Sequence, residues 1–160
     1  AGKVYWKNKR VESTPQLAAN IGLTYRSRNN IFVSLDCNYY DNMYLSMSPI
    51  AFTDMALTPS MVTSNDRLEK VRGQEKFDAA YVLNASVGKN WYIDRKYTLG
   101  FSLSVDNLLN KQDIKTGGYE QLRLSSQSTD GSTEKYYEKF SPKYFYMFGT
   151  TYYLNLYFRF

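Results

Sequence analysis

The 160-residue chain contains no histidine, a single cysteine and no long apolar run. Without histidine, a Ser-His-Asp or Cys-His catalytic arrangement cannot be built, and the commonest metal ligand is missing. Cys37 alone excludes an intrachain disulfide, and its place in an alternating apolar pattern favours inert packing over a nucleophile. Because no stretch of about 18 apolar residues occurs, a transmembrane helix is excluded. We therefore expect no enzymatic activity and no cofactor.

Aromatic residues, in contrast, are plentiful. They make up 17% of the chain, which carries 16 tyrosines, a net charge of +5 and a mean hydropathy of −0.52. A membrane barrel can have such a low value, because lumen-facing and lipid-facing residues alternate along its strands. A basic chain rich in tyrosine also suits the stacking of nucleic-acid bases. The tyrosines fall on alternate strand positions and at strand ends, however, so we expect no nucleic-acid partner.

The final stretch, residues 144–160, alternates with a period of two between apolar and mixed positions. This period predicts one long β-strand with two unlike faces. A soluble strand is usually only ~5–6 residues long. Aromatic residues bracket an aliphatic pair here, as an aromatic girdle would. The alternate positions are Tyr144, Tyr146, Phe148, Thr150, Tyr152, Leu154, Leu156, Phe158 and Phe160.

Four further segments show the same alternation and are predicted to be strands. Each is long enough for a tilted strand to cross a bilayer, which takes ~9–11 residues. The connections between strands are alternately short and long, which is typical of the short periplasmic turns and long extracellular loops of outer-membrane barrels. The four segments are residues 16–26, 31–40, 77–92 and 97–106. The connections are residues 27–30, 41–76, 93–96 and 107–143.

These patterns predict an all-β fold, namely a fragment of an antiparallel transmembrane β-barrel. Five strands cannot close a bacterial barrel, which uses about eight or more, and lipid cannot satisfy an open sheet edge. We therefore expect residues 1–160 to be the C-terminal portion of one barrel domain whose earlier strands are absent from this chain. The chain begins at Ala1 without a secretory signal, which favours a mature or partial chain.

Three motifs near the C-terminus resemble the TonB-dependent outer-membrane receptors. They are SVDNLLN at residues 104–110, GGYE at residues 117–120 and PKYFYMFG at residues 142–149. The resemblance runs from about Gln16 to Phe160 and is to the branch with an N-terminal carboxypeptidase-like regulatory domain. It implies a 22-stranded barrel with an N-terminal plug, located in the cell outer membrane and active in nutrient uptake. This chain would supply the last five strands, and no segment of it resembles the plug or a TonB box.

The resemblance also implies partners. These are outer-membrane lipid and lipopolysaccharide, the remainder of the barrel and the plug, the TonB complex through the missing N-terminal part, the barrel-assembly machinery and a surface lipoprotein. The terminal apolar pattern is similar to the assembly signal of such barrels, although residues 153–160 lack the usual glycine. The residues expected to carry this signal are Leu154, Leu156, Phe158 and Phe160.

Ligand contacts are expected from aromatic residues at the outer mouth, for which packing within the loops is the competing role. The candidates are Tyr40, Tyr44, Tyr119, Tyr136 and Tyr137. Oxygen ligands for calcium occur nearby, but they lack the spacing of a known calcium loop, so no metal site is expected. Those residues are Asp106, Asn107, Asn110 and Asp113.

One alternative stays open, a soluble all-β carbohydrate-binding module with an aromatic platform. The two hypotheses differ in the surroundings of Leu154, Leu156 and Phe158. A barrel exposes this face to lipid, whereas a soluble sandwich buries it against a second sheet.

Overall fold

The computed structural model describes residues 4, 6–53, 73–94, 96–121, 124–128 and 135–160. These residues form antiparallel β-structure with one short 3-10 helix, η1 (Pro49–Phe52), which confirms the predicted all-β class. The chain divides into two compact units. We call residues 17–41, 79–114 and 146–160 the sheet unit, and residues 1–16, 42–78 and 115–145 the loop unit.

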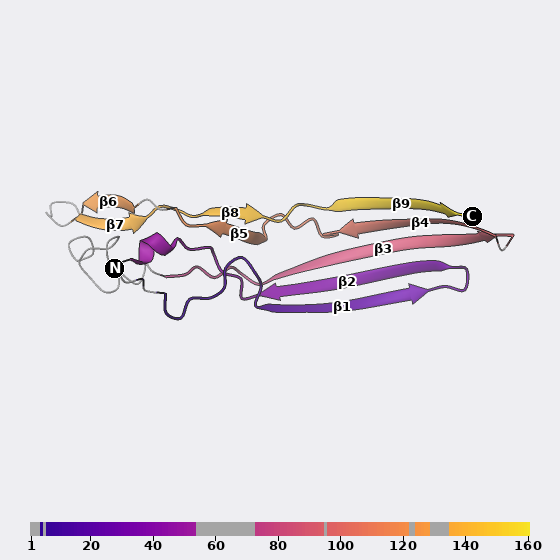
Figure 1. The fold of residues 1–160 in the computed structure, drawn as a ribbon, viewed down its shortest axis with the longest axis horizontal. Helices are drawn as coiled ribbons and strands as arrows, with labels where there is room; N and C mark the ends of the chain where they lie inside the picture. The colour runs from indigo at the N-terminus through magenta and orange to yellow at the C-terminus, as the bar shows by residue number, and fades with distance from the viewer. Residues whose placement is uncertain (1–3, 5, 54–72, 95, 122–123, 129–134) are drawn as a thin grey trace. The chain divides into compact units, whose positions relative to one another are not determined.

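The sheet unit is one five-stranded sheet with the strand order β1-β2-β3-β4-β9 (Figure 1). Every neighbouring pair is antiparallel. Because each strand pairs with its neighbour in sequence except β9, the sheet is a meander to which the end of the chain is added. The strands are β1 (Leu17–Arg26), β2 (Ile31–Asp41), β3 (Ala80–Ile93), β4 (Tyr97–Asp106) and β9 (Thr151–Arg159).

Both predicted short turns are present, and they lie at the same end of this sheet (Figure 1). In the first turn, the Ser27 amide donates a hydrogen bond to the Ile31 carbonyl at 2.8 Å, and Asn30 has a φ of +55°. In the second, the Lys96 amide donates to the Ile93 carbonyl, and Asp94 has a φ of +49°. Asn and Asp tolerate this left-handed conformation better than other non-glycine residues, so the local sequence suits both turns.

The prediction of one continuous strand over residues 144–160 was wrong. The structure has two strands there, β8 (Lys143–Tyr146) and β9, separated by residues 147–150. Backbone groups in this gap bond elsewhere: the Met147 amide donates to the Ile114 carbonyl, and the Thr150 amide donates to the Asn110 side chain. An apolar period shows which residues share a face, but it does not show where the ladder of hydrogen bonds is interrupted.

The loop unit contains the remaining strands. A two-stranded sheet joins β5 (Lys115–Tyr119) to β8, and another joins β6 (Leu124–Ser128) to β7 (Lys135–Lys139). The second long connection expected from the sequence therefore holds strands of its own, whereas the described part of the first holds η1 and isolated β-bridges. Buried side chains form a small core in this unit: Met43, Leu45, Met47, Phe52 and Phe77.

Two glycines of the sheet unit lie beneath aromatic rings. A Cβ atom at Gly88 would meet the Phe32 ring and the Phe101 backbone oxygen, and one at Gly100 would meet the Tyr157 ring. Both glycines are buried in spite of having no side chain. The rings therefore lie flat over the strand and replace the missing side chains, which stabilises a strand that glycine alone would weaken.

Candidate functional site

One face of the five-stranded sheet is apolar from edge to edge. The strand registers place Ile21, Leu35, Leu83, Leu103 and Leu154 on the same side, together with every second residue along each of their strands. These side chains are solvent-accessible in the described structure. Among them, the exposed large apolar residues are Leu17, Ile21, Leu23, Tyr25, Val33, Leu35, Tyr39, Tyr81, Val87, Trp91, Ile93, Tyr97, Leu99, Tyr152, Leu154, Leu156 and Phe158.

Aromatic side chains lie at both ends of this apolar face. At the end away from the turns, Tyr39 pairs directly with Tyr81. At the turn end, Trp91 lies 5.8 Å from Phe101 between ring centroids, and Tyr97 stacks on Phe158 at the same distance with an interplanar angle of 14°. The apolar face is thus aliphatic in the middle and aromatic at its margins.

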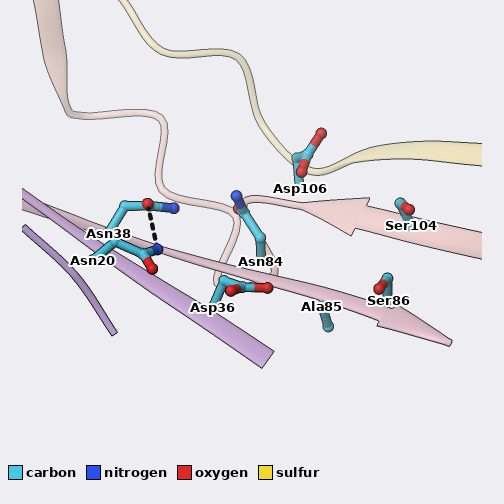
Figure 2. Close-up of a pocket in the computed structure, with 8 residues that line it drawn as sticks. All are labelled: Asn20, Asp36, Asn38, Asn84, Ala85, Ser86, Ser104 and Asp106. Atoms are coloured by element: carbon cyan, nitrogen blue, oxygen red, sulfur yellow. Dashed lines mark hydrogen bonds between the residues drawn. The ribbon is translucent and has the colours of Figure 1, made fainter. Parts of the chain in front are cut away.

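The opposite face of the sheet is polar and carries its own hydrogen bonds. Asn20 donates to the Asn38 side-chain oxygen at 2.9 Å, and the hydroxyls of Ser34 and Ser86 lie 2.6 Å apart. On this side lies a hollow of about 350 Å³, whose lining residues are drawn in Figure 2. Its lining is Asn20, Asp36, Asn38, Asn84, Ala85, Ser86, Ser104 and Asp106.

The polar hollow offers amide, hydroxyl and carboxylate oxygens, which suit water and polar groups. Asp36 and Asp106 are its two charged residues. In the part of the chain that the structure describes, no three His, Cys, Asp or Glu residues gather where a metal ion could be held.

The motif at residues 107–110 forms a clasp between strands, which we call the asparagine clasp. Asn107 is 3% exposed and has a φ of +52°. Its side-chain amide donates hydrogen bonds to the carbonyls of Lys111 at 2.8 Å and Phe148 at 2.9 Å, and its side-chain oxygen accepts one from the Lys111 amide. Its backbone amide donates to the Asn84 side chain at 3.0 Å.

The asparagine clasp also holds the start of β9. The Thr150 hydroxyl donates to the Asn107 carbonyl at 2.9 Å, and the Thr150 amide donates to the Asn110 side-chain oxygen at 3.1 Å. One motif thus connects the end of β4, residue Asn84 of β3 and the segment that enters β9. The two leucines between the asparagines are exposed, so the asparagines make the side-chain contacts of the clasp.

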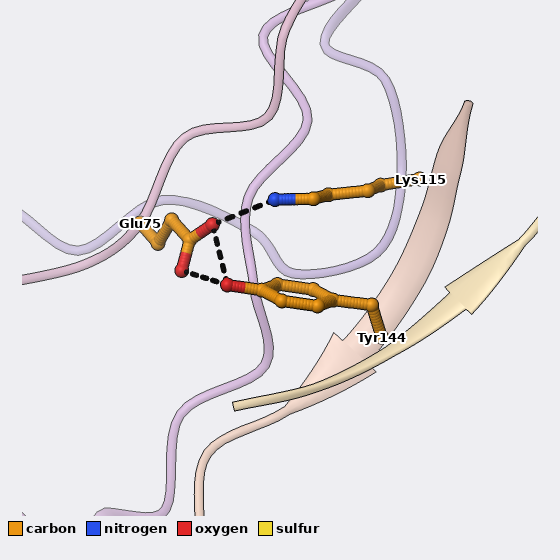
Figure 3. Close-up of polar contacts among 3 residues, drawn as sticks. All are labelled: Glu75, Lys115 and Tyr144. Atoms are coloured by element: carbon orange, nitrogen blue, oxygen red, sulfur yellow. Dashed lines mark hydrogen bonds and ion pairs between the residues drawn. The ribbon is translucent and has the colours of Figure 1, made fainter. Parts of the chain in front are cut away.

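In the loop unit, Glu75, Lys115 and Tyr144 form a polar cluster (Figure 3). The Tyr144 hydroxyl donates to the Glu75 carboxylate, whose two oxygens lie 2.9 and 2.8 Å away. The Lys115 ammonium lies 3.2 Å from the same carboxylate and 3.8 Å from the centroid of the Tyr144 ring. Burial, and then the bond to Glu75, raise the pKa of the Tyr144 hydroxyl above its ordinary value.

This polar cluster predicts a loss of stability at alkaline pH. Because the pKa of Tyr144 is raised in the folded state, its contribution is fully present below the unfolded pKa of about 10 and is lost as pH rises through the folded pKa. Following loop-unit unfolding by denaturant titration between pH 8 and 12 measures this loss. The Tyr144→Phe variant should have a smaller decline over the same window. An equal decline in both proteins would contradict the assignment to this hydroxyl.

The candidate ligand contacts belong to different elements of the two units. Tyr40 packs against the buried residues Ala80, Val82 and Ile114, so it belongs to a small core of the sheet unit. Tyr44 pairs with Lys76 in a β-bridge of the loop unit. Tyr119, on β5, is 50% exposed. The side chains of Tyr136 and Tyr137 lie outside the described residues, and their backbone belongs to β7.

Of the residues expected to form the assembly signal, Leu154, Leu156 and Phe158 lie on the apolar face of β9. Phe160 follows the strand and is 96% exposed. Cys37 is partly exposed on the same apolar face, opposite Ile21 and Leu83. Its surroundings there agree with a packing role.

Sequence reasoning missed Glu75 and Lys115 altogether. Glu75 and Tyr144 are 69 residues apart, and no short motif connects them. The only local signal was the GGYE motif, where Gly118 has a φ of +152° and allows close approach to the Lys143 carbonyl. That close approach belongs to the β5–β8 pairing, which brings Lys115 and Tyr144 onto neighbouring strands.

Comparison with protein-family models, with curated proteins and with solved structures gave no match for this chain. Within the described residues, no helix has the length and apolar character needed to span a membrane.

Proposed function

We propose that this chain forms part of the barrel wall of a TonB-dependent outer-membrane receptor that takes up a nutrient. The observation that carries the proposal is the apolar face of the five-stranded sheet, which is exposed across all its strands. Monomeric soluble proteins rarely expose a continuous apolar area of more than a few hundred Å². A membrane barrel has such a face, because its outer surface contacts lipid.

The dimensions of the apolar face support a lipid-facing role. Along β3, Tyr81 and Trp91 mark its two aromatic margins, ten positions apart. At ~3.4 Å per residue they are ~34 Å apart along the strand. A strand tilt of ~40° reduces this to ~26 Å across the membrane, close to the ~25 Å apolar band of outer-membrane barrels.

The polar face and the unpaired edges of the sheet also agree with a barrel wall. The Asn, Ser and Asp side chains around the polar hollow suit a water-filled or protein-filled lumen. Strands β1 and β9 each have one edge with no partner strand among the described residues. We propose that further strands pair there, because lipid cannot satisfy open backbone groups.

On this proposal the turns with Asn30 and Asp94 are periplasmic and the loop unit is extracellular. Tyr44 and Tyr119 of the loop unit stay candidate ligand contacts, with no enzymatic role. Transport would further need the plug and the TonB complex, which the resemblance at residues 104–110, 117–120 and 142–149 implies. The terminal apolar residues of β9 would be read by the barrel-assembly machinery.

The second candidate is a soluble carbohydrate-binding module, and one observation favours it. Tyr119 and Phe145, on the paired strands β5 and β8, are 50% and 57% exposed, with ring centroids 6.0 Å apart. Exposed neighbouring rings can stack on a sugar. This candidate, however, requires the apolar face of the sheet unit to be buried against another protein layer.

A spin-label experiment on β1 tests the proposal. Leu23 and Thr24 are adjacent and both exposed, but they lie on opposite faces of the sheet. A nitroxide would be attached at Leu23→Cys or, as the matched control, at Thr24→Cys, each in a Cys37→Ser background with all adjoining natural sequence retained. In membranes, the Leu23 label should collide with oxygen more than with a water-soluble nickel chelate, and the Thr24 label should show the reverse.

The outcomes separate the two candidates. A Leu23 label that neither reagent reaches would mean that the apolar face is covered by protein, which supports the soluble module. A Leu23 label reached by the nickel chelate as readily as Thr24 would place the face in water and overturn the receptor proposal.

A further inference from the structure

Charged residues are unevenly distributed along the sheet unit. The turn end carries five described cations, and the one described carboxylate side chain there is that of Asp94. The positions follow from the strand registers, since Lys89 pairs with the first residue of β2 and Arg159 pairs with the second residue of β4. We call these cations the basic rim: Arg26, Arg28, Lys89, Lys96 and Arg159.

The opposite end of the sheet unit has the reverse character. Asp41 ends β2, Asp106 ends β4, and Asp113 follows the asparagine clasp, whereas Lys111 is the single described cation among them. The basic rim is therefore a property of one end and not a general excess of positive charge. Fields from clustered like charges attract counter-charges to that end.

The basic rim is available for binding. Arg26, Arg28, Lys96 and Arg159 are exposed. Among the described residues, no carboxylate forms an ion pair with any member of the rim. The contacts recorded for the rim are to aromatic rings: the Lys89 ammonium is 5.1 Å from the Trp91 centroid, and the Arg159 guanidinium is 5.7 Å from the Tyr157 centroid.

The rim is continuous with the aromatic margin of the apolar face. Lys89 is on that face itself, beside Trp91, Tyr97 and Phe158, whereas the registers place Arg26 and Arg159 on the opposite face. The members that can reach the lipid side are therefore Lys89 and the two turn residues Arg28 and Lys96. Lysine at such a margin keeps its stem on apolar surface while its ammonium reaches the polar boundary. This order matches the layers of a bilayer: the apolar surface would meet hydrocarbon, the aromatic rings the interface, and the cations the headgroup phosphates.

We propose that the basic rim binds the headgroups of anionic phospholipids in the leaflet at the turn end of the sheet. This inference depends on the proposed function, because the apolar face must first lie in lipid. Charge complementarity selects the occupant: the rim has almost no compensating carboxylate, and a phosphodiester headgroup supplies the missing negative charge. Each cation near a membrane surface strengthens the attraction to anionic lipid about fivefold.

The test measures which lipids surround the protein in a membrane. The natural protein, with any adjoining sequence retained, would be reconstituted in phosphatidylcholine with trace spin-labelled lipid. The ratio of association constants for labelled phosphatidylglycerol and labelled phosphatidylcholine gives the selectivity. We expect a preference of about fivefold for phosphatidylglycerol at low salt, and a much smaller one at high salt because exposed charges are then screened.

Two triple variants provide the comparison. The rim variant carries Arg28→Gln, Lys89→Gln and Lys96→Gln, and its selectivity should fall towards one. The matched control carries Lys7→Gln, Arg10→Gln and Lys143→Gln, which removes the same charge from exposed positions of the loop unit. The control should keep the natural selectivity.

Each remaining outcome counts against a definite claim. Immobilised lipid without a preference for phosphatidylglycerol would contradict headgroup binding by the basic rim and would leave the receptor proposal standing. An equal loss of selectivity in both variants would also overturn the rim, because net charge alone would then explain it. No immobilised lipid of either kind would overturn the proposed function, and the rim with it.

Discussion

Replacing Leu156 with arginine is expected to destabilise the membrane-inserted protein by ~2–4 kcal/mol, the cost of a basic residue facing lipid near the bilayer midplane. Leu156 is 70% exposed and lies opposite Phe101 near the middle of the apolar face. In lipid its present exposure is favourable, whereas an arginine there must distort the bilayer or extend to its surface. Equilibrium denaturant unfolding in phospholipid vesicles measures the difference.

The neighbouring residue provides the control for this prediction. Asn155 is also exposed, but it lies on the polar face opposite Ser102. Asn155→Arg should change the unfolding free energy by less than ~1 kcal/mol, since polar-face substitutions tune selectivity more than stability. Similar costs at Leu156 and Asn155 would mean that the two faces meet the same environment, and the barrel proposal would fail.

Replacing Asn107 with alanine should destabilise the sheet unit by ~3–5 kcal/mol. Three side-chain hydrogen bonds are lost at ~1 kcal/mol each, and the part-buried carbonyls of Lys111 and Phe148 lose a partner. Alanine must also adopt the φ of +52° that Asn107 has, which adds ~1–2 kcal/mol. Denaturant unfolding of the natural protein in vesicles would give the magnitude.

Two further variants divide this effect into its parts. Asn107→Gly removes the hydrogen bonds but tolerates the positive φ, so it should be less destabilising than alanine by ~1–2 kcal/mol. Leu109→Ala changes an exposed residue of the same motif and should cost under ~1 kcal/mol. A cost at Leu109 as large as that at Asn107 would show that the leucines, and not the asparagines, stabilise the motif.

Hydrophobic periodicity was sufficient to predict the sheet. The alternation around Ile21, Leu35 and Leu83 predicted three neighbouring strands and the residues that share a face, because side chains on a strand point alternately to opposite sides. The strand beginning at Ala80 was placed three residues too early. Phe77, which extended the apparent period, is instead buried in the core of the loop unit.

Contacts between residues far apart in the chain could not be predicted from the sequence. Asn107 was considered only within a motif and as a possible calcium ligand, because its bonds to Phe148 and Asn84 depend on where β3 and β9 lie. Tyr40, a candidate ligand contact, packs against Ala80 and Ile114, which approach it from other segments. Period and composition describe the neighbours of a residue along the chain, whereas these roles depend on neighbours in space.

The connections between strands also determine the order in which the sheet can form. Short turns close β1 on β2 and β3 on β4, so these hairpins pay little loop entropy and should form early. The β2–β3 pairing closes residues 42–79, and β9 must return across residues 107–150 to reach β4, so both of these pairings should form later. The asparagine clasp lies where that return ends. Until β9 pairs there, β4 has an unpaired edge next to the apolar face of the sheet. During that time the newly made protein needs protection from aggregation.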